Sequence, residues 1–187
     1  MGLVAGEICS WVDPIPMDSN ELRAAQAPWK AQYREAPEKA RVTLRARGRL
    51  NEGVSCRIET GQALVTAGLH PATGGVGGTA CSGEMLLEAL VACTGVTLNA
   101  VATALGVPLR DATLEAEGEL DFRGTLGVAK EVPVGFQNIR MTVTLDTDAS
   151  EQQIADLLRL TERYCVVLQT LKRPPELALV RRERKAG

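Results

Sequence analysis

The chain has 187 residues with a net charge of −2, and 45% of its residues are apolar and 24% charged. This size and composition are typical of one globular domain with a single core. The charge offers no bulk attraction to phosphates, and an aromatic fraction of only 3% leaves few side chains to stack on bases. We therefore expect neither nucleic acid nor a membrane as a partner.

The first forty residues differ from the rest because four prolines interrupt them. Within residues 1–40 the sequence predicts one short helix, from Glu21 to Glu35, with Ser19 or Asn20 as its cap. We interpret residues 1–40 as an N-terminal arm and residues 41–187 as the domain. The start of the chain lacks the basic flank and long apolar run of a secretory signal, so we expect a cytoplasmic protein.

Short strands are predicted where the domain begins. Apolar and polar residues alternate from Arg41 and again from Val54 to Ile58, with a turn at residues 51–53 between them, and a third apolar piece covers 63–67. We expect these strands to form a small antiparallel meander. A glycine-rich stretch at 68–78 follows and reads as a loop, since it lacks the ending of a phosphate-binding P-loop.

Two long helices and further strands complete the pattern. The apolar run from Met85 to Leu105 carries Glu88 and Asn99, so we interpret it as a buried core helix and not as a membrane span. Ser82 would cap this helix and Gly106 would end it. The other elements expected are strands at 113–122 and 139–145, a helix from Ser150 to the prolines at 174–175, and a last strand at 177–180. The predicted fold class is α+β, with antiparallel sheets and two long central helices.

Thiol chemistry is the functional lead, because the chain has five cysteines but no Cys-x-x-Cys spacing and only one histidine. Neither a disulfide framework nor a zinc site is indicated, and we expect no metal and no cofactor. Cys93 and Cys165 fall on the two predicted helices. A reactive thiolate needs a helix N-terminus, a cation or a hydrogen bond, and Cys93 lies mid-helix. From the residues alone, a buried packing role and a redox role both remain open. The cations that could assist are Arg45, Arg49, Arg57 and Arg163.

Two other residues are candidates for a functional role. Cys81 precedes the predicted cap of the long helix, where backbone N–H groups could favour its thiolate. His70 could pair with a cysteine in a hydrolase, although no orienting acid or amide is identifiable. The acidic strand face of Glu115, Glu117, Glu119 and Asp121 is typical of a solvated surface more than of a metal site.

A resemblance adds to these observations. Residues 81–93 (CSGEMLLEALVAC) and residues 160–171 (LTERYCVVLQTL) together resemble the two-cysteine signature of the OsmC/Ohr superfamily, the osmotically inducible and organic hydroperoxide resistance proteins. The resemblance extends over about residues 41–180. It implies an OsmC-like fold, an intertwined homodimer with its sites at the subunit interface, and a small apolar hydroperoxide as substrate.

The resemblance also implies roles for individual residues. Cys93 would attack the peroxide, and its sulfenic acid would condense with Cys165 to a disulfide that a dithiol reductant resets. An Arg and a Glu would support Cys93, with Arg49 as the first candidate, Arg57 as the next, and Glu84 as the carboxylate.

The chain departs from the hydroperoxide-resistance branch at two positions. Glu84 stands nine residues before Cys93 where that branch has ten, half a turn out of phase on a helix. Val166 replaces the proline that commonly follows the second cysteine. Two alternatives to a peroxidase therefore stay open: a non-catalytic OsmC-like binding or stress-associated dimer, and a thiol switch or transferase in which Cys81 joins the pair.

Overall fold

The computed structural model describes residues 18–35, 47–51, 55–59, 64–73, 78–127 and 129–182. The predicted strand at 41–46 and most of the turn at 51–53 lie outside these residues. In chain order the elements are α1 (Ser19–Glu35), β1 (Arg47–Asn51), β2 (Ser55–Glu59), β3 (Leu64–Gly68), the 3-10 turn η2 (Pro71–Thr73), β4 (Ala80–Cys81), α2 (Ser82–Leu105), β5 (Asp111–Glu119), α3 (Phe122–Thr125), β6 (Asn138–Asp146), α4 (Glu151–Tyr164) and α5 (Val166–Lys172).

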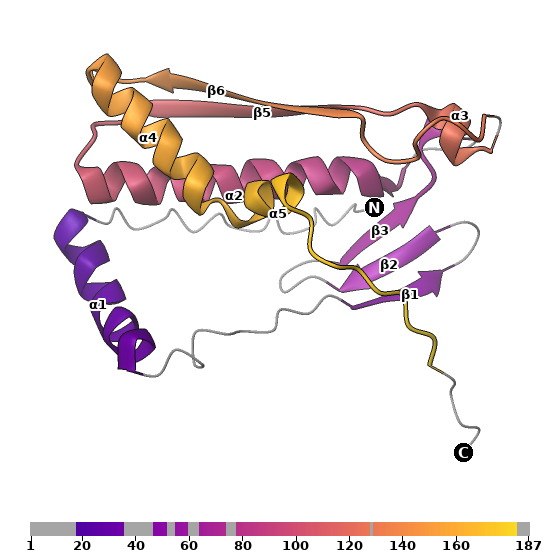
Figure 1. The fold of residues 1–187 in the computed structure, drawn as a ribbon, viewed down its shortest axis with the longest axis horizontal. Coiled ribbons are helices and arrows are strands. Elements are labelled where there is room, and N and C mark those ends of the chain that lie inside the picture. The colour runs from indigo at the N-terminus through magenta and orange to yellow at the C-terminus, as the bar shows by residue number, and fades with distance from the viewer. Residues whose placement is uncertain are drawn as a thin grey trace, which may run out of the picture.

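The helix α2 lies beside a long two-stranded ribbon, and α4 and α5 pack against α2 (Figure 1). The ribbon is β5 paired antiparallel with β6 over its full length, from Asp111 opposite Asp146 to Glu119 opposite Asn138. Along both strands, exposed and half-buried residues alternate strictly, so one face of the ribbon lies on the helices and the other faces solvent. This mixed helix and sheet arrangement confirms the predicted α+β class.

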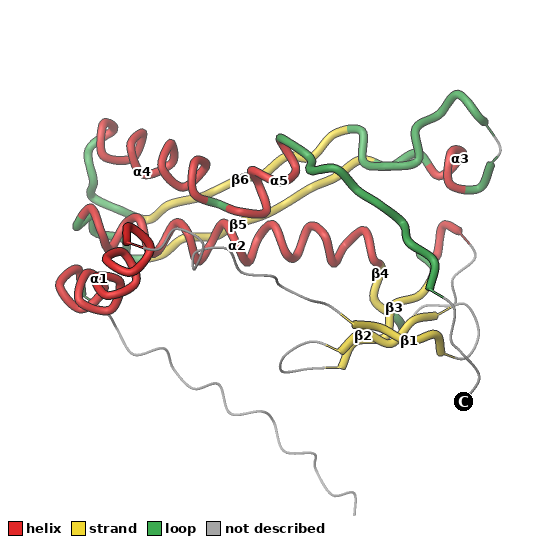
Figure 2. Tube along the Cα trace, turned by 60° about the horizontal axis from the view of Figure 1, so that its bottom comes forward, coloured by secondary structure: helices red, strands yellow, loops and turns green. Residues whose placement is uncertain are grey.

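The small sheet forms a second unit near the start of α2 (Figure 2). Strands β1, β2 and β3 make the predicted antiparallel meander, with Arg49 opposite Arg57 in the β1–β2 register. Strand β4 adds to β3 in parallel, with Cys81 opposite Gly68. The sequence did not predict β4, because two residues are too few to show an alternation.

The ends of α2 show one correct prediction and one wrong one. Gly106 ends the helix as predicted, at a φ of 67° that favours glycine, and the Val107 N–H returns to the Ala102 carbonyl. The predicted cap Ser82 is instead the first helical residue. Cys81 holds the cap position in an extended conformation, and its side chain makes no capping bond.

The predicted helix from Ser150 to the prolines is broken at Cys165. Ser150, where the helix was expected to begin, is the cap of α4 and makes reciprocal bonds with Gln153. Cys165 is extended, with φ −70° and ψ 109°, and it ends α4 and begins α5. The β-branched Val166 and Val167 that follow favour helix continuation less than straight-chain residues do. Cys165 therefore sits at a junction and not on a continuous helix.

Two further predictions need correction at an element's end, and one predicted strand does not form. The strand at 113–122 stops at Glu119, because Phe122 begins the short helix α3, which Asp121 caps. The cap of α1 is Asp18, whose carboxylate accepts the Asn20 and Glu21 N–H groups, and not Ser19 or Asn20. Residues 177–180 form no strand, since within the described part of this single chain no strand edge pairs with them.

The core lies where α2 crosses α4, and it buries one stripe of α2. The stripe repeats every four residues, as one face of a helix does: Leu90, Thr94, Leu98 and Ala102. By length and composition α2 is apolar enough to cross a membrane, which is also true of many core helices, yet only 28% of its most apolar window is buried. The predicted core helix is thus buried on one face, and Val96 on another face is 73% exposed.

Candidate functional site

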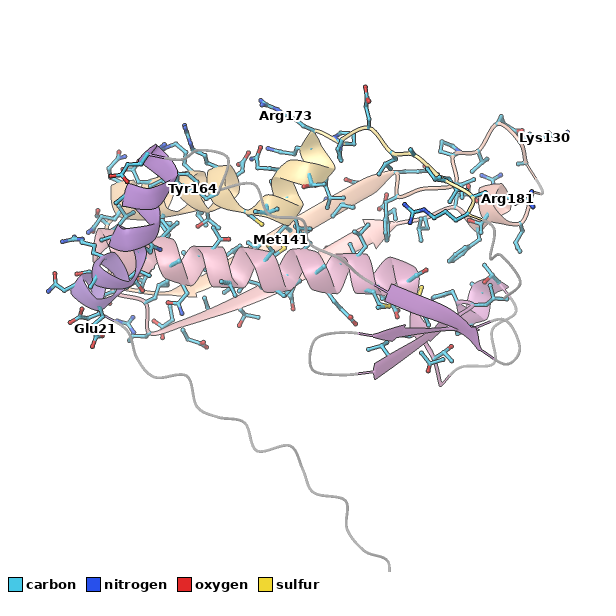
Figure 3. The ribbon with its side chains drawn as sticks, turned by 90° about the horizontal axis from the view of Figure 1, so that it is seen from below. Glu21, Lys130, Met141, Tyr164, Arg173 and Arg181 are labelled. Carbon is cyan, nitrogen blue, oxygen red and sulfur yellow. The ribbon has the colours of Figure 1, made fainter. Side chains whose placement is uncertain are left out.

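The structure places Cys93 and Cys165, the two cysteines of the OsmC/Ohr resemblance, close together. Cys93 lies in the middle of α2, and Cys165 lies at the α4–α5 junction that packs beside it. Figure 3, in which Tyr164 and Arg173 mark the ends of α4 and α5, shows this junction beside α2. Both thiols are free, and the Cys165 thiol is one of the groups that lower the pKa of Cys93. Cys93 is half-buried, whereas Cys165 is completely buried.

The surroundings of Cys93 favour its thiolate. Burial raises the pKa of the Cys93 thiol, but hydrogen bonds lower it and outweigh burial, so that its pKa falls below the ordinary cysteine value. The donors are the backbone N–H of Val167, the thiol of Cys165 and the backbone N–H of Val166. A low thiol pKa is what a nucleophilic cysteine requires near neutral pH.

The two backbone donors to Cys93 come from the start of a helix, although Cys93 itself lies in the middle of one. Val166 and Val167 are the first two residues of α5, and their N–H groups have no partner within that helix. Cys93 gains nothing from the start of its own helix, but the start of another helix supplies it with donors. The sequence could not reveal this, because the contact joins residues more than seventy positions apart.

The hydroxyls of Thr94 and Thr97 complete the site, and sequence reasoning missed both. Thr94 Oγ1 lies 3.4 Å from Cys165 Sγ, and Thr97 Oγ1 donates to the Cys93 carbonyl at 2.7 Å. The position of Thr97 four residues after Cys93 was a usable signal, because residues at i and i+4 share a helix face. The contact of Thr94 with Cys165 had no local signal.

Glu84 lies in a different place. It lines a pocket of about 420 Å³ together with Cys81 and His70, at the start of α2. Nine residues separate it from Cys93, roughly 13 Å along the helix axis. Within the described part of this one chain, Glu84 is not among the groups that shift the pKa of Cys93.

The candidate cations are placed as follows. Arg49 and Arg57 face each other in the backbone register of β1 and β2, in the small sheet near the start of α2 (Figure 1), and their side chains lie outside the described part. Arg163 is exposed, and its guanidinium lies 5.7 Å from the ring centre of Tyr164. Arg45 lies outside the described residues. Among the described residues, the groups that shift the pKa of Cys93 include no arginine.

Cys81 and His70 share the separate pocket with Glu84. His70 accepts the Ala72 N–H at Nδ1, and its ring stacks on Phe122 with centres 5.0 Å apart. Cys81 is twelve residues from Cys93, roughly 18 Å along α2. The structure therefore does not join Cys81 to the Cys93–Cys165 pair in this chain. Nor do three His, Cys, Asp or Glu side chains gather as a metal site among the described residues.

Comparison with known families identifies the chain. The family model described as OsmC-like protein matches residues 75–180, which include both cysteines and the described groups that lower the pKa of Cys93. This chain belongs to the OsmC-like protein family. A search of curated proteins finds no match.

Solved structures show that the OsmC-like fold extends over most of the chain. An OsmC-like protein from Mycoplasma pneumoniae is 21% identical, with a TM-score of 0.59, and the match covers 71% of this chain and 89% of that one. An organic hydroperoxide resistance protein OsmC from Legionella pneumophila is 16% identical, with a TM-score of 0.55, covering 71% and 90%. An organic hydroperoxide resistance protein from Elizabethkingia anophelis is 13% identical, with a TM-score of 0.57, covering 72% and 91%. At these identities the likeness concerns the fold alone.

Proposed function

We propose that this OsmC-like chain is a thiol-dependent peroxidase that reduces organic hydroperoxides. The observation that carries the proposal is the lowered pKa of Cys93 beside a second free thiol. A thiolate is the nucleophile that attacks a peroxide oxygen, and a neighbouring thiol can trap the product. Membership of a family that includes organic hydroperoxide resistance proteins supports the choice of substrate class.

The proposed reaction has three steps. The Cys93 thiolate attacks one peroxide oxygen, the O–O bond breaks, and the alkoxide leaves as an alcohol after gaining a proton. The product, a Cys93 sulfenic acid, then condenses with the Cys165 thiol to form a disulfide and release water. An external dithiol reduces the disulfide by exchange and restores both thiols.

A homodimer is part of the proposal. In a single chain α2 leaves apolar side chains uncovered, and the segment after α5 exposes Leu177 at 90% and Leu179 at 106%. An exposed apolar surface of this kind marks an interaction site. A second copy would cover α2 and pair with the extended C-terminal segment. It would also offer Cys93 an arginine, Arg49 or Arg57, and the Glu84 carboxylate, which within the described part of one chain is not among the groups that shift the pKa of Cys93. We further propose that this dimer acts in the cytoplasm.

The first prediction tests the roles of the two cysteines. We expect wild type to consume cumene hydroperoxide rapidly when a dithiol reductant is present, and Cys93→Ser to lose at least about a thousandfold of this rate, because it lacks the nucleophile. Cys165→Ser should still react once, since its Cys93 is intact. The measurement is stopped-flow peroxide consumption, with intact mass recorded after one equivalent of oxidant.

The masses distinguish the steps. Wild type should lose two hydrogens, and peptide mapping should join Cys93 to Cys165. Cys165→Ser should instead gain one oxygen, and Cys81→Ser, a matched control, should behave as wild type. Absence of both turnover and Cys93 oxidation in wild type would exclude the peroxidase and favour a binding dimer. Trapping of Cys81 in a mixed disulfide would favour the thiol switch.

A further inference from the structure

One buried hydrogen bond links the two helical units at the site. Thr94, the residue after Cys93, is 2% exposed, and its Oγ1 lies 3.4 Å from the Sγ of Cys165, which is 0% exposed. The two residues are 71 positions apart, so packing of the α4–α5 junction on α2 creates the contact. Thr94 lies in the buried stripe of α2 and has no access to solvent.

Thr94 uses its hydroxyl differently from two other threonines, Thr97 of α2 and Thr161 of α4. A threonine inside a helix commonly donates its hydroxyl to the carbonyl four residues earlier. Thr97 does so toward Cys93 at 2.7 Å, and the buried Thr161 does so toward Leu157 at 2.8 Å. The hydroxyl of Thr94 is instead directed across the helix interface to a sulfur atom. This placement is unnecessary if Thr94 serves for packing alone.

We propose that Thr94 is a positioning residue for Cys165. Its hydroxyl donates a hydrogen bond to the Cys165 sulfur and holds that sulfur beside Cys93. The inference rests on the proposed function and assigns a residue to its disulfide-forming step. Within the described part of the chain the Thr94 hydroxyl has no other hydrogen-bond partner, and a hydroxyl is a stronger donor than a thiol. The shared proton is therefore assigned to the Thr94 hydroxyl. This leaves the Cys165 proton for the Cys93 sulfur.

The same bond helps the disulfide to form. When the Cys93 sulfenic acid is present, Cys165 must lose its proton and attack the Cys93 sulfur. The S–S bond forms, the S–O bond breaks, and the leaving hydroxide takes up the Cys165 proton as water. Negative charge develops on the Cys165 sulfur, which is completely buried, and the Thr94 hydroxyl is the donor that stabilises it.

The test measures closure of the disulfide apart from peroxide chemistry. Each variant is oxidised with one equivalent of cumene hydroperoxide, and separately with diamide, a diazene whose thiol adduct on Cys93 must also be displaced by Cys165. Samples are quenched in acid at successive times, their free thiols are alkylated, and the intact mass of the protein is measured. We expect Thr94→Val, which keeps the shape but removes the hydroxyl, to slow closure about tenfold with both oxidants, the effect of one lost hydrogen bond. Excess peroxide should then convert more Cys93 to sulfinic acid.

Controls separate positioning from packing. Thr94→Ser should restore closure, because it returns the hydroxyl although it loses a methyl group, and Thr161→Val should close as wild type does. Should Thr94→Val not fold, as judged by circular dichroism, Thr94→Ala and Thr94→Ser make the same comparison. Closure at the wild-type rate without the hydroxyl, with either oxidant, would overturn the inference.

The two oxidants also distinguish this inference from the proposed function. If the wild type does not react with hydroperoxide but diamide closes its disulfide, and Thr94→Val slows that closure, the peroxidase proposal is wrong. The positioning role of Thr94 is then supported. A wild type that neither oxidant closes would overturn both proposals.

Discussion

At the scale of single residues, the two cysteines occupy environments suited to different tasks. Cys93 is half-buried and has a lowered pKa, so its sulfur is partly accessible and is favoured as a thiolate. Cys165 is completely buried and bonded to Thr94, so it is protected from outside oxidants. This asymmetry supports Cys93 as the thiol that attacks and Cys165 as the one that resolves.

Two glycines of the fold permit a matched stability prediction. A Cβ atom on Gly118 would lie 2.5 Å from the Phe136 ring, a distance that forces the ring or the strand to move. We expect Gly118→Ala to lower the free energy of unfolding by about 1–3 kcal/mol through overpacking. A Cβ on Gly95 would meet Leu114 at an ordinary 3.7 Å. Gly95→Ala should instead add about 1 kcal/mol of helix propensity in α2.

Urea unfolding followed by circular dichroism measures both changes. Similar effects of Gly118→Ala and Gly95→Ala would show that neither the ring contact nor the helix position matters as described.

At the scale of elements, the break between α4 and α5 places two backbone N–H groups at Cys93. These groups have no partner within α5. Val166→Pro tests this, because proline suits the first position of a helix and removes one donor. The extended conformation of Cys165 is the one that a residue before proline prefers, and the Val166 side chain is 70% exposed. We therefore expect the variant to fold and the pKa of Cys93 to rise.

The pH dependence of alkylation reads out this shift. The rate at which iodoacetamide modifies Cys93, followed by peptide mass, should increase as pH rises through the thiol pKa and then level off. In wild type the lowered pKa puts this rise at a lower pH than for an ordinary cysteine. In Val166→Pro the rise should move to higher pH, and in Val166→Ala, which keeps the N–H, it should stay. An unmoved profile in Val166→Pro would show that this N–H is not a donor to Cys93.

At the scale of the whole molecule, the uncovered faces predict self-association. We expect sedimentation equilibrium to give a dimer for wild type, because Val96 on α2 and Leu179 after α5 are exposed at 73% and 106%. Val96→Glu and Leu179→Glu should each shift the dimer toward monomer, since they would place a charge in an apolar interface. The control Leu126→Glu changes a leucine that is 55% exposed in the turn after α3.

The outcome has a clear contrary case. A monomeric wild type, or equal weakening by all three substitutions, would contradict an interface built on α2 and the C-terminal segment.

The sequence predicted most elements because their signals are local. The alternation along β5 and β6, the capping box at Ser150 and the left-handed Gly106 depend on neighbours a few residues away. Some wrong predictions concern element ends, where Cys81 and not Ser82 caps α2. Others concern whole elements, since Cys165 divides the second predicted helix and residues 177–180 form no strand. At these places tertiary contacts compete with weak local preferences.

For the site, the sequence by itself determined which cysteines to examine and the family resemblance that pairs them. Only the tertiary structure decided how Cys93 is activated, because its donors come from α5 and from the α4–α5 junction. It alone brought Thr94 to Cys165 and set Glu84 in another pocket. Spacing along a chain fixes which residues share a helix face, whereas a hydrogen bond across 71 positions depends on how whole helices pack.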